Sequence, residues 1–212
     1  MTYISWNRSG RFRLYFNNNH TDTASQVVVQ LKRKRKETGI LDYNEEDEPR
    51  KSELGNDYKF QIQTFVADGL LLWRTKTKRI AREYFAIAIE NGFPQVSFNL
   101  GRDKRFFSIR ATKRVDDGHW HIIHVKRKKR IGMISVDGER IVRGRSSPGS
   151  KSLRTTAKLW IGGTSSLPPG LPDAYYKGFY GCIKEFLVHN KPFNLLSNID
   201  GKKVNFCHVN DV

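Results

Sequence analysis

The sequence contains no long apolar run. Within its 212 residues nothing approaches the ~20 consecutive apolar residues that a membrane-spanning helix needs, so we expect no membrane insertion. An N-terminal apolar segment typical of a secretion signal is also missing, and we expect any such signal to lie outside this sequence. Hydrophobic residues still make up 38% of the chain, which is enough for one sandwich or barrel core.

The common catalytic motifs are missing as well. No G-x-S-x-G, P-loop, H-E-x-x-H or G-x-G-x-x-G pattern is present. His119 and His121 fall on one face of a predicted strand, as two metal ligands would, but no cysteine or carboxylate pattern completes a metal site. Asp116 and Asp117, just before Gly118, are typical turn formers. These absences argue against an enzyme.

Cysteine is scarce, because the chain has only Cys182 and Cys207. Their spacing does not fit a metal site. If oxidised, they would close a loop worth roughly 3–4 kcal/mol, and only in an oxidising compartment. Two N-x-Ser/Thr glycosylation sequons, at Asn7 and Asn19, favour the same compartment. We therefore expect a secreted glycoprotein that lies outside the cell.

Negative charge is in short supply. Lys and Arg number 38 against 21 Asp and Glu, which gives a formal net charge of +17. Self-repulsion of this size destabilises a compact chain, so it usually persists where an anionic partner uses it. Nucleic acid, an anionic membrane and a sulfated polysaccharide are the three candidate classes. The basic runs Lys32–Lys36 and Lys126–Arg130 contain no aromatic residue to stack on bases, which disfavours nucleic acid.

Short runs of alternating apolar and polar residues dominate the sequence from residue 58 onward. Gly-, Asp- and Asn-containing turns separate these runs, and no convincing ten-residue amphipathic helix is present. Arg11–Phe16 is expected to be a further strand. About residues 20–57, whose second part is strongly acidic, are expected to form a charged, flexible insertion. The pattern predicts one all-β domain, an antiparallel sandwich or jelly roll over residues 1–212.

Several segments, taken in order, resemble one protein family. They are DGLLLW (68–73), YFAIAIENGFPQVSFNLG (84–101), VDDGHWHIIHVKR (115–127), ISVDGE (134–139), LWIGG (159–163) and GFYGCIKEFLV (178–188). Together with Cys207 they resemble the laminin G-like domain over about residues 58–207. RSSPG (145–149) and LPPGLPDAYYKGFYGC (167–182) are similar to the subgroup near the C-termini of agrin and perlecan. The resemblance implies a concanavalin-like jelly roll of two antiparallel sheets in a basement-membrane or cell-surface protein.

The same resemblance carries expectations for individual residues. It implies a Cys182–Cys207 disulfide. It also implies core positions for Trp73, Trp120 and Trp160, where large rings supply apolar burial.

Many members of the family bind one calcium ion, and four positions here match its ligands. They are Glu83, the main-chain carbonyls of Leu100 and Ser152, and Arg154. A guanidinium offers no lone pair and carries the ion's own sign, so Arg154 cannot be a ligand. We expect a degenerate site and no metal cofactor. We hypothesise that Arg154 pairs with Glu83 where calcium would lie.

The run Lys126–Arg130 falls between two predicted strands of a hairpin. One or two cations would protect a sheet edge, but five exceed that need. The predicted glycan-binding residues are Lys126, Arg127, Lys128, Lys129, Arg130, Arg79, Arg82, Arg102, Lys104, Arg105, Arg143, Arg145, Lys151 and Arg154.

Clustered Lys and Arg are typical of heparin sites. We predict a non-enzymatic adhesion or scaffold module that binds heparan sulfate, or a similar acidic glycan, through a basic rim of loops. Binding of a protein receptor or of a dystroglycan-type glycan is the alternative. Binding of nucleic acid is less favoured.

Overall fold

The computed structural model describes residues 54–75, 83–101, 106–155, 159–164, 167–193 and 195, and assigns two further short strands at Gln30–Leu31 and Val204–Asn205. Regular structure in these residues is almost entirely β, with one short 3-10 helix, η1 (Asp173–Tyr176). None of the described helical residues forms a segment long and apolar enough to cross a membrane.

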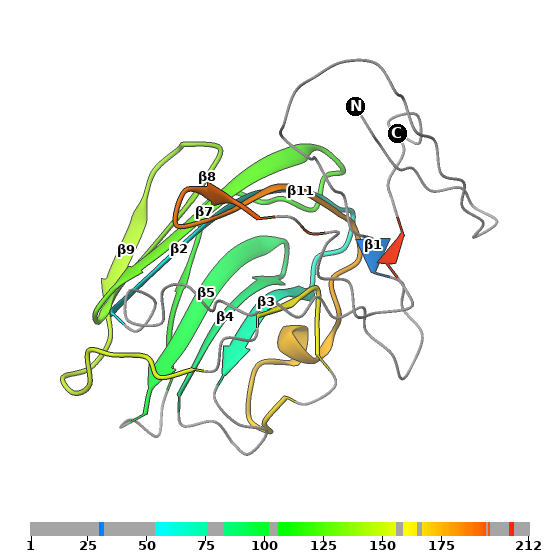
Figure 1. Ribbon diagram of the computed structural model, residues 1–212. Helices are drawn as coiled ribbons and strands as arrows, with labels where there is room; N and C mark the ends of the chain where they lie inside the picture. Colours follow the sequence, from blue (N-terminus) through cyan, green and yellow to red (C-terminus); the bar gives the residue numbers. More distant parts are fainter. Residues whose placement is uncertain are drawn as a thin grey trace.

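Two antiparallel sheets face each other in a sandwich (Figure 1). The five-stranded sheet contains, in spatial order, β10 (Trp160–Ile161), β3 (Gly69–Thr75), β4 (Glu83–Glu90), β5 (Phe93–Leu100) and β6 (Phe107–Arg110). The six-stranded sheet contains β12 (Lys191–Pro192), β11 (Cys182–Val188), β2 (Gly55–Gln63), β7 (Trp120–Lys128), β8 (Ile131–Val136) and β9 (Val142–Arg145). A separate small sheet pairs β1 (Gln30–Leu31) with β13 (Val204–Asn205). The predicted all-β sandwich is confirmed.

The period-two alternation of β2 and β7 supplies one wall of the core. Tyr58, Phe60 and Ile62 are buried and alternate with residues that face outward. In the paired strand β7, Ile123 and Val125 are buried in the same way. They join one apolar cluster with side chains of the facing sheet. Burying each such side chain is worth about 1.5–3 kcal/mol, so this cluster holds the two sheets together.

The outer face of the five-stranded sheet is covered too, which explains the nearly unbroken apolar sequence of β4. Trp73 and Tyr84 lie on that face, their rings stacked with centroids 4.8 Å apart. Tyr175 of η1 packs on them and donates its hydroxyl to Ser97 Oγ at 2.9 Å. A strand with both faces covered needs no polar alternation. Trp160 packs partly buried against the same cluster.

Trp120 corrects the prediction that three tryptophans lie in the core. It is the first residue of β7 and is only half-buried. Lys184 Nζ lies 4.1 Å from the centre of its ring, on the face of the sheet opposite to the core. The alternation of β7 gives the physical reason, because Trp120 has the parity of the outward residues.

The predicted insertion over about residues 20–57 ends earlier in the structure than the sequence pattern indicates. β2 begins at Gly55, so residues 55–57 are part of the sandwich. The remaining residues of that insertion, other than those of β1 and Leu54, lie outside the described residues, as does the predicted strand Arg11–Phe16.

Two glycines let the sheets approach closely near one edge. Gly132 of β8 and Gly144 of β9 are cross-strand partners. A Cβ on Gly144 would lie 2.8 Å from side-chain atoms of Ile109 and Phe107, and one on Gly132 would lie 3.0 Å from Phe98 Cε1. Side chains of the facing sheet therefore occupy the space that larger residues at these positions would need.

We expect Gly144→Val to lower the free energy of unfolding by about 1–3 kcal/mol, because the added methyl groups would overpack this contact. Denaturant titration monitored by tryptophan fluorescence measures the change. Arg143→Val, at the neighbouring outward position of β9, is the control and should stay within about 0.5 kcal/mol of the native protein. Equal losses in both variants would contradict the close approach of the sheets at Gly144.

Candidate functional site

The predicted basic hairpin is present, but its five cations do not share one environment. β7 pairs with β8 as far as Lys128 and Ile131, and only Lys129 and Arg130 form the connecting turn. Lys126 and Lys128 are outward-facing strand residues. The side chains of this run therefore point to two faces of the sheet, which a reading of the run as one loop does not reveal.

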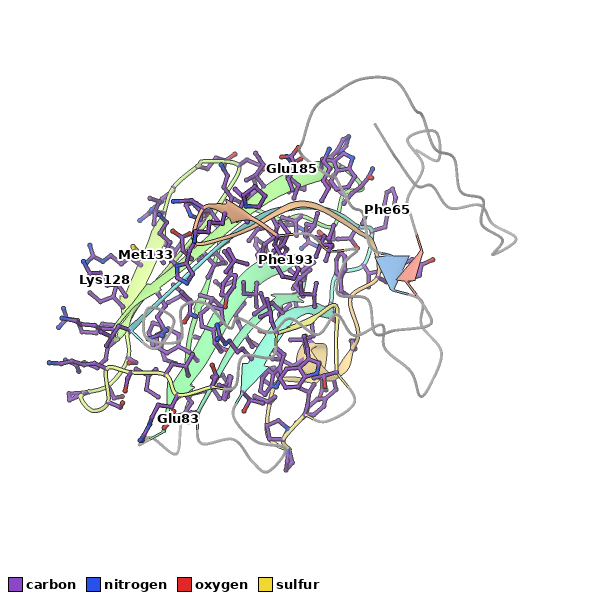
Figure 2. The ribbon with its side chains drawn as sticks, viewed as in Figure 1. Phe65, Glu83, Lys128, Met133, Glu185 and Phe193 are labelled. Carbon is purple, nitrogen blue, oxygen red and sulfur yellow. The ribbon has the colours of Figure 1, made fainter. Side chains whose placement is uncertain are left out.

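The outward cations form a patch on the six-stranded sheet. Two cross-strand rows run over β7, β8 and β9, namely Lys128–Ile131–Arg145 and Lys126–Met133–Arg143. Residues directly opposite each other on paired strands share one face, so these four cations lie together. With the turn they form what we call the basic face, which comprises Lys126, Lys128, Lys129, Arg130, Arg143 and Arg145. Figure 2 shows Lys128 and Met133 near each other at this end of the sheet.

One carboxylate partly neutralises the basic face. Asp57 Oδ2 lies 3.0 Å from Lys126 Nζ, and Asp57 Oδ1 lies 2.9 Å from His124 Nε2. The side chains of Lys128, Lys129, Arg143 and Arg145 are exposed. The sequence pattern places Asp57 in the charged insertion, so only the β2–β7 register reveals its role.

Arg127 corrects the prediction that the whole run contacts a glycan. Its side chain is 2% exposed and points between the sheets, where Nε donates to Asn56 Oδ1 at 2.7 Å. Nη1 donates to the carbonyl oxygen of Lys129 at 2.9 Å. Burial lowers the pKa of Arg127 to about 10, which still leaves it protonated at neutral pH. Arg127 thus supports the turn from inside and is not available at the surface.

The other predicted cations divide into two groups. Lys151 and Arg154 are exposed in the segment between β9 and β10. The second group lies outside the described residues and comprises Arg79, Arg82, Arg102, Lys104 and Arg105. The predicted glycosylation sites Asn7 and Asn19 and the predicted disulfide partner Cys207 also lie outside the described residues.

Arg154 contacts Glu83, as hypothesised from the sequence. The backbone N–H of Arg154 donates to Glu83 Oε2 at 2.6 Å, and Arg154 Nη2 lies 3.3 Å from Glu83 Oε1. Gly101 leaves room for this carboxylate, since a Cβ there would lie 2.8 Å from Glu83 Oε1. The carbonyl of Ser152 accepts a hydrogen bond from Ser150 Oγ at 3.0 Å. Because donors occupy both oxygens of Glu83 and one is a cation, these residues do not fit calcium.

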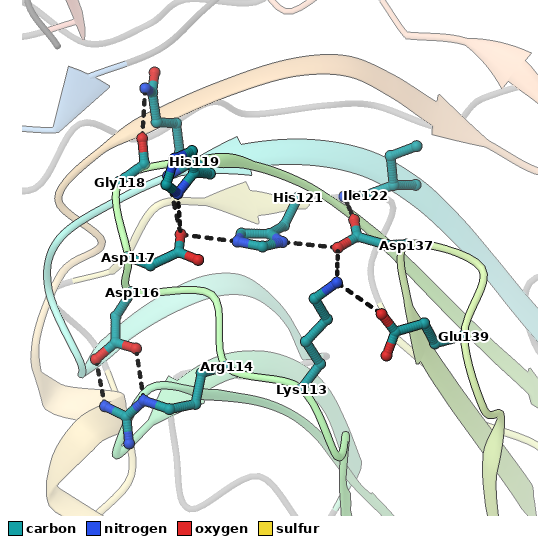
Figure 3. Close-up of polar contacts among 11 residues, drawn as sticks. Lys113, Arg114, Asp116, Asp117, Gly118, His119, His121, Ile122, Asp137 and Glu139 are labelled. Atoms are coloured by element: carbon teal, nitrogen blue, oxygen red, sulfur yellow. Dashed lines mark hydrogen bonds and ion pairs between the residues drawn. The ribbon is translucent and has the colours of Figure 1, made fainter.

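A second polar cluster lies at the other end of β7, around His121 (Figure 3). His121 Nδ1 lies 2.8 Å from Asp137 Oδ2, and His121 Nε2 lies 2.9 Å from Asp117 Oδ1. Lys113 Nζ contacts Asp137 at 2.9 Å and Glu139 at 2.7 Å. His119 precedes β7, and both ring nitrogens of His121 lie against carboxylate oxygens. Within the described residues, no group of three or more His, Cys, Asp or Glu side chains is arranged for a metal ion.

The contacts of His121 favour its protonated form. Burial lowers its pKa, but the hydrogen bonds to Asp137 and Asp117 outweigh burial and raise the pKa above 6.5. A backbone hydrogen bond from His119 and the side chain of His121 lower the pKa of Asp117 to about 2. Burial opposes ionisation of Asp137, yet its bonds to His121 and Lys113 lower the pKa below 3.8. These contacts therefore favour an imidazolium between the two carboxylates.

This cluster predicts a pH-dependent contribution to stability. Protonated His121 contributes its full share of the free energy of unfolding below about pH 6.5, the pKa of histidine in the unfolded chain. This share declines as the pH rises through the higher pKa of His121 in the folded protein. The contribution of Asp117 and Asp137 is present above about pH 4 and declines as the pH falls toward 2. We expect His121→Gln to cost about 2 kcal/mol between these limits and less at alkaline pH, as measured by denaturant titration.

His119→Gln is the comparison for this experiment, because the side chain of His119 is 78% exposed. It should change stability little at any pH, since exposed ion pairs contribute little. A loss for His121→Gln that is the same at pH values on both sides of the histidine titration would contradict an imidazolium at this position.

Comparisons with known proteins agree with the sandwich geometry. The Laminin G domain family model matches residues 62–194. The basement membrane-specific heparan sulfate proteoglycan core protein of mouse is 30% identical over 139 residues, which cover 65% of this chain and 4% of that protein. Human pikachurin is 29% identical over 150 residues, 69% of this chain and 15% of that protein. The chain therefore spans only a small part of the length of these relatives.

Solved structures show the same fold. Domains LG4-5 of the mouse laminin alpha1 chain superpose with a TM-score of 0.73 at 20% identity, covering 89% of this chain and 49% of that one. The LG1-3 region of the laminin alpha2 chain gives a TM-score of 0.71 at 21% identity, covering 92% of this chain and 37% of that one. With a family model that matches more than half of its length, this chain belongs to the laminin G domain family.

Proposed function

We propose that this laminin G domain is a secreted binding module that holds heparan sulfate, or a chemically similar sulfated chain, on its basic face. The observation that carries the proposal is the register of β7, β8 and β9. It collects Lys126, Lys128, Arg143 and Arg145 on one outward face beside the cationic turn. Two such rows of cations match a polyanion that runs across the strands better than they match a single small anion.

The turn itself supports a binding role. Lys129 has φ 56°, in the left-handed region that Gly, Asn or Asp would adopt at lower cost. The buried Arg127 holds the Lys129 carbonyl, and the Lys129 N–H donates to the Leu54 carbonyl oxygen at 2.7 Å. A turn selected only to protect a sheet edge would not need a lysine at a strained position.

A sulfated chain fits this surface for electrostatic reasons. Binding of a polyanion releases its condensed counterions, and each cation that engages the chain adds to the salt dependence. Arg143 and Arg145 add planar, bidentate hydrogen bonds to sulfate or carboxylate oxygens. Ile131 and Met133 lie between the cations of the two rows. A bound glycan chain contacts these uncharged side chains, which do not compete with the cations for its anionic groups.

The state of Cys182 and the relatives of the chain support an extracellular location. Cys182 at the start of β11 is disulfide-bonded in the structure, in keeping with the predicted Cys182–Cys207 bond and an oxidising compartment. One of the relatives named above is a basement membrane-specific proteoglycan core protein. His121 and Glu83 form ion pairs with other residues of the fold. Because these contacts occupy their polar atoms, the two clusters favour a binding module over an enzyme.

We expect Lys128→Gln/Lys129→Gln to weaken binding to a long heparin chain and to lower the salt dependence. Each lost contact should reduce the slope of log affinity against log salt by about 0.7–0.9 if the behaviour of nucleic-acid phosphates transfers. Calorimetry or immobilised-heparin binding over a salt series measures both. Lys177→Gln/Lys191→Gln removes the same formal charge from exposed positions outside the basic face and is the matched control. Equal effects of the two double variants would reject the basic face.

Heparin binding should not require calcium, because Arg154 already supplies a cation to Glu83. A chelator should leave affinity and thermal stability unchanged. Arg154→Asp should create a carboxylate pair with Glu83 and allow calcium to raise the melting temperature of the variant, since opposed carboxylates attract a hard cation. Loss of heparin binding by the native protein in chelator would contradict this prediction.

A further inference from the structure

The edge strand β9 of the six-stranded sheet has a partner on one side only. It pairs with β8, and among the described residues no strand pairs with its other side (Figure 1). The N–H and C=O groups along such an edge can form hydrogen bonds with an added strand. This edge is therefore an interaction surface that differs in chemistry from the side chains of the basic face.

The register of β9 shows which backbone groups point away from β8. The Ser146 N–H donates to the carbonyl of Arg130 at 2.9 Å, which makes these two residues a hydrogen-bonded pair. In an antiparallel ladder, hydrogen-bonded pairs alternate with pairs that are not bonded to each other. Gly144 therefore directs its backbone groups toward β8, while Arg143 and Arg145 direct theirs to the free edge.

The two sides of this edge carry different side chains. Arg143 and Arg145 are exposed on the outward side, and neither forms an ion pair with another described residue. On the inward side, Phe107, Ile109 and Val142 are half-buried and pack against the core, where β6 and β9 lie near each other. A strand added to β9 would thus meet cations on one of its faces and apolar groups on the other.

We propose that β9 binds, by antiparallel strand addition, an extended segment of a partner protein in which acidic and apolar residues alternate. Two acidic residues of that segment lie opposite Arg143 and Arg145 and exchange backbone hydrogen bonds with them. Side chains directly opposite each other share a face, so each carboxylate meets a guanidinium, and the apolar residue between them packs toward Ile109 and Val142. A protein partner of this kind is additional to the proposed sulfated chain and does not depend on it.

A second copy of this chain is a poorer occupant of the same edge. Antiparallel pairing of two β9 strands about Gly144 would place Arg143 of one copy opposite Arg145 of the other. Like charges directly opposite each other are destabilising. Cations on an edge strand often prevent such pairing. The same arginines attract an acidic strand, so protection from self-pairing and binding of this partner are compatible.

The test uses short blocked peptides of alternating aspartate and valine, N-methylated either at the aspartate amides or at the valine amides. Both peptides carry the same charge, but only methylation at aspartate removes the donors that would face Arg143 and Arg145. Calorimetry on the whole chain, at a salt concentration of about 0.15 M, measures binding. We expect the aspartate-methylated peptide to bind at least about fivefold more weakly. The unmethylated peptide should slow hydrogen exchange of the Arg143 and Arg145 amides.

Arg143→Pro and Arg143→Gln are a matched pair of variants for the same hydrogen bonds. Both remove the guanidinium, but only proline removes the N–H at the free edge, a position where edge strands tolerate proline. We expect Arg143→Pro to bind the unmethylated peptide about fivefold more weakly than Arg143→Gln does. Lys191→Gln, on the opposite edge strand β12, should bind as the native protein does. The methylated peptides test the native protein, so the proposal stays testable if Arg143→Pro lowers stability.

Weaker binding of the aspartate-methylated peptide, together with slower exchange of both arginine amides, supports strand addition. Equal binding of the two methylated peptides, or unchanged exchange at Arg143 and Arg145, overturns it. Self-association of the native protein that Arg143→Pro abolishes, as measured by sedimentation, would assign the edge to a second copy and overturn it too. These outcomes leave the proposed heparin site standing, because heparin contacts side chains, and Arg143→Pro and Arg143→Gln should weaken heparin binding equally.

Discussion

The pairing of β2 with β7 places the core residues and the basic face at the same time. Nine successive residues of each strand are in register, from Gly55–Lys128 to Gln63–Trp120. Because side chains alternate across a strand, this one register sends Ile123 and Val125 into the core and Lys126 outward beside Asp57. A slip by one residue would expose the core residues and bury the cations, so packing energy fixes the position of the basic face.

Arg127 shows how the core and the surface are coupled. Its alkyl stem and guanidinium lie between the sheets, and its hydrogen bonds end on Asn56 and on the carbonyl of Lys129. A buried cation is costly unless its donors are paired, so the turn that displays Lys129 is tied to a group that cannot move without penalty. The exposed cations are thereby held on a rigid support, which would reduce the entropy lost on binding of the proposed polyanion.

Charge is used differently at the ends of the sandwich. Among the described residues, one carboxylate, that of Asp57, contacts a cation of the basic face, and the cations outnumber it. Around His121 and at the Glu83–Arg154 pair, opposite charges meet within hydrogen-bonding or ion-pair distance. Paired groups stabilise the fold and are poor sites for an external ligand, whereas unequal charge attracts one. This contrast, rather than the net charge alone, is the reason why we propose binding on β7–β9.

The all-β class, the family and the hairpin could be predicted from the sequence, because strand alternation, turn residues and the order of motifs are local signals. It also predicted the contact between Arg154 and Glu83. Strand pairing was needed to separate Arg127 from its neighbours, to place Asp57 in β2, and to bring Arg143 and Arg145 beside Lys126 and Lys128. Those features depend on which strands pair and in which register, and register is set by packing between residues far apart in the chain.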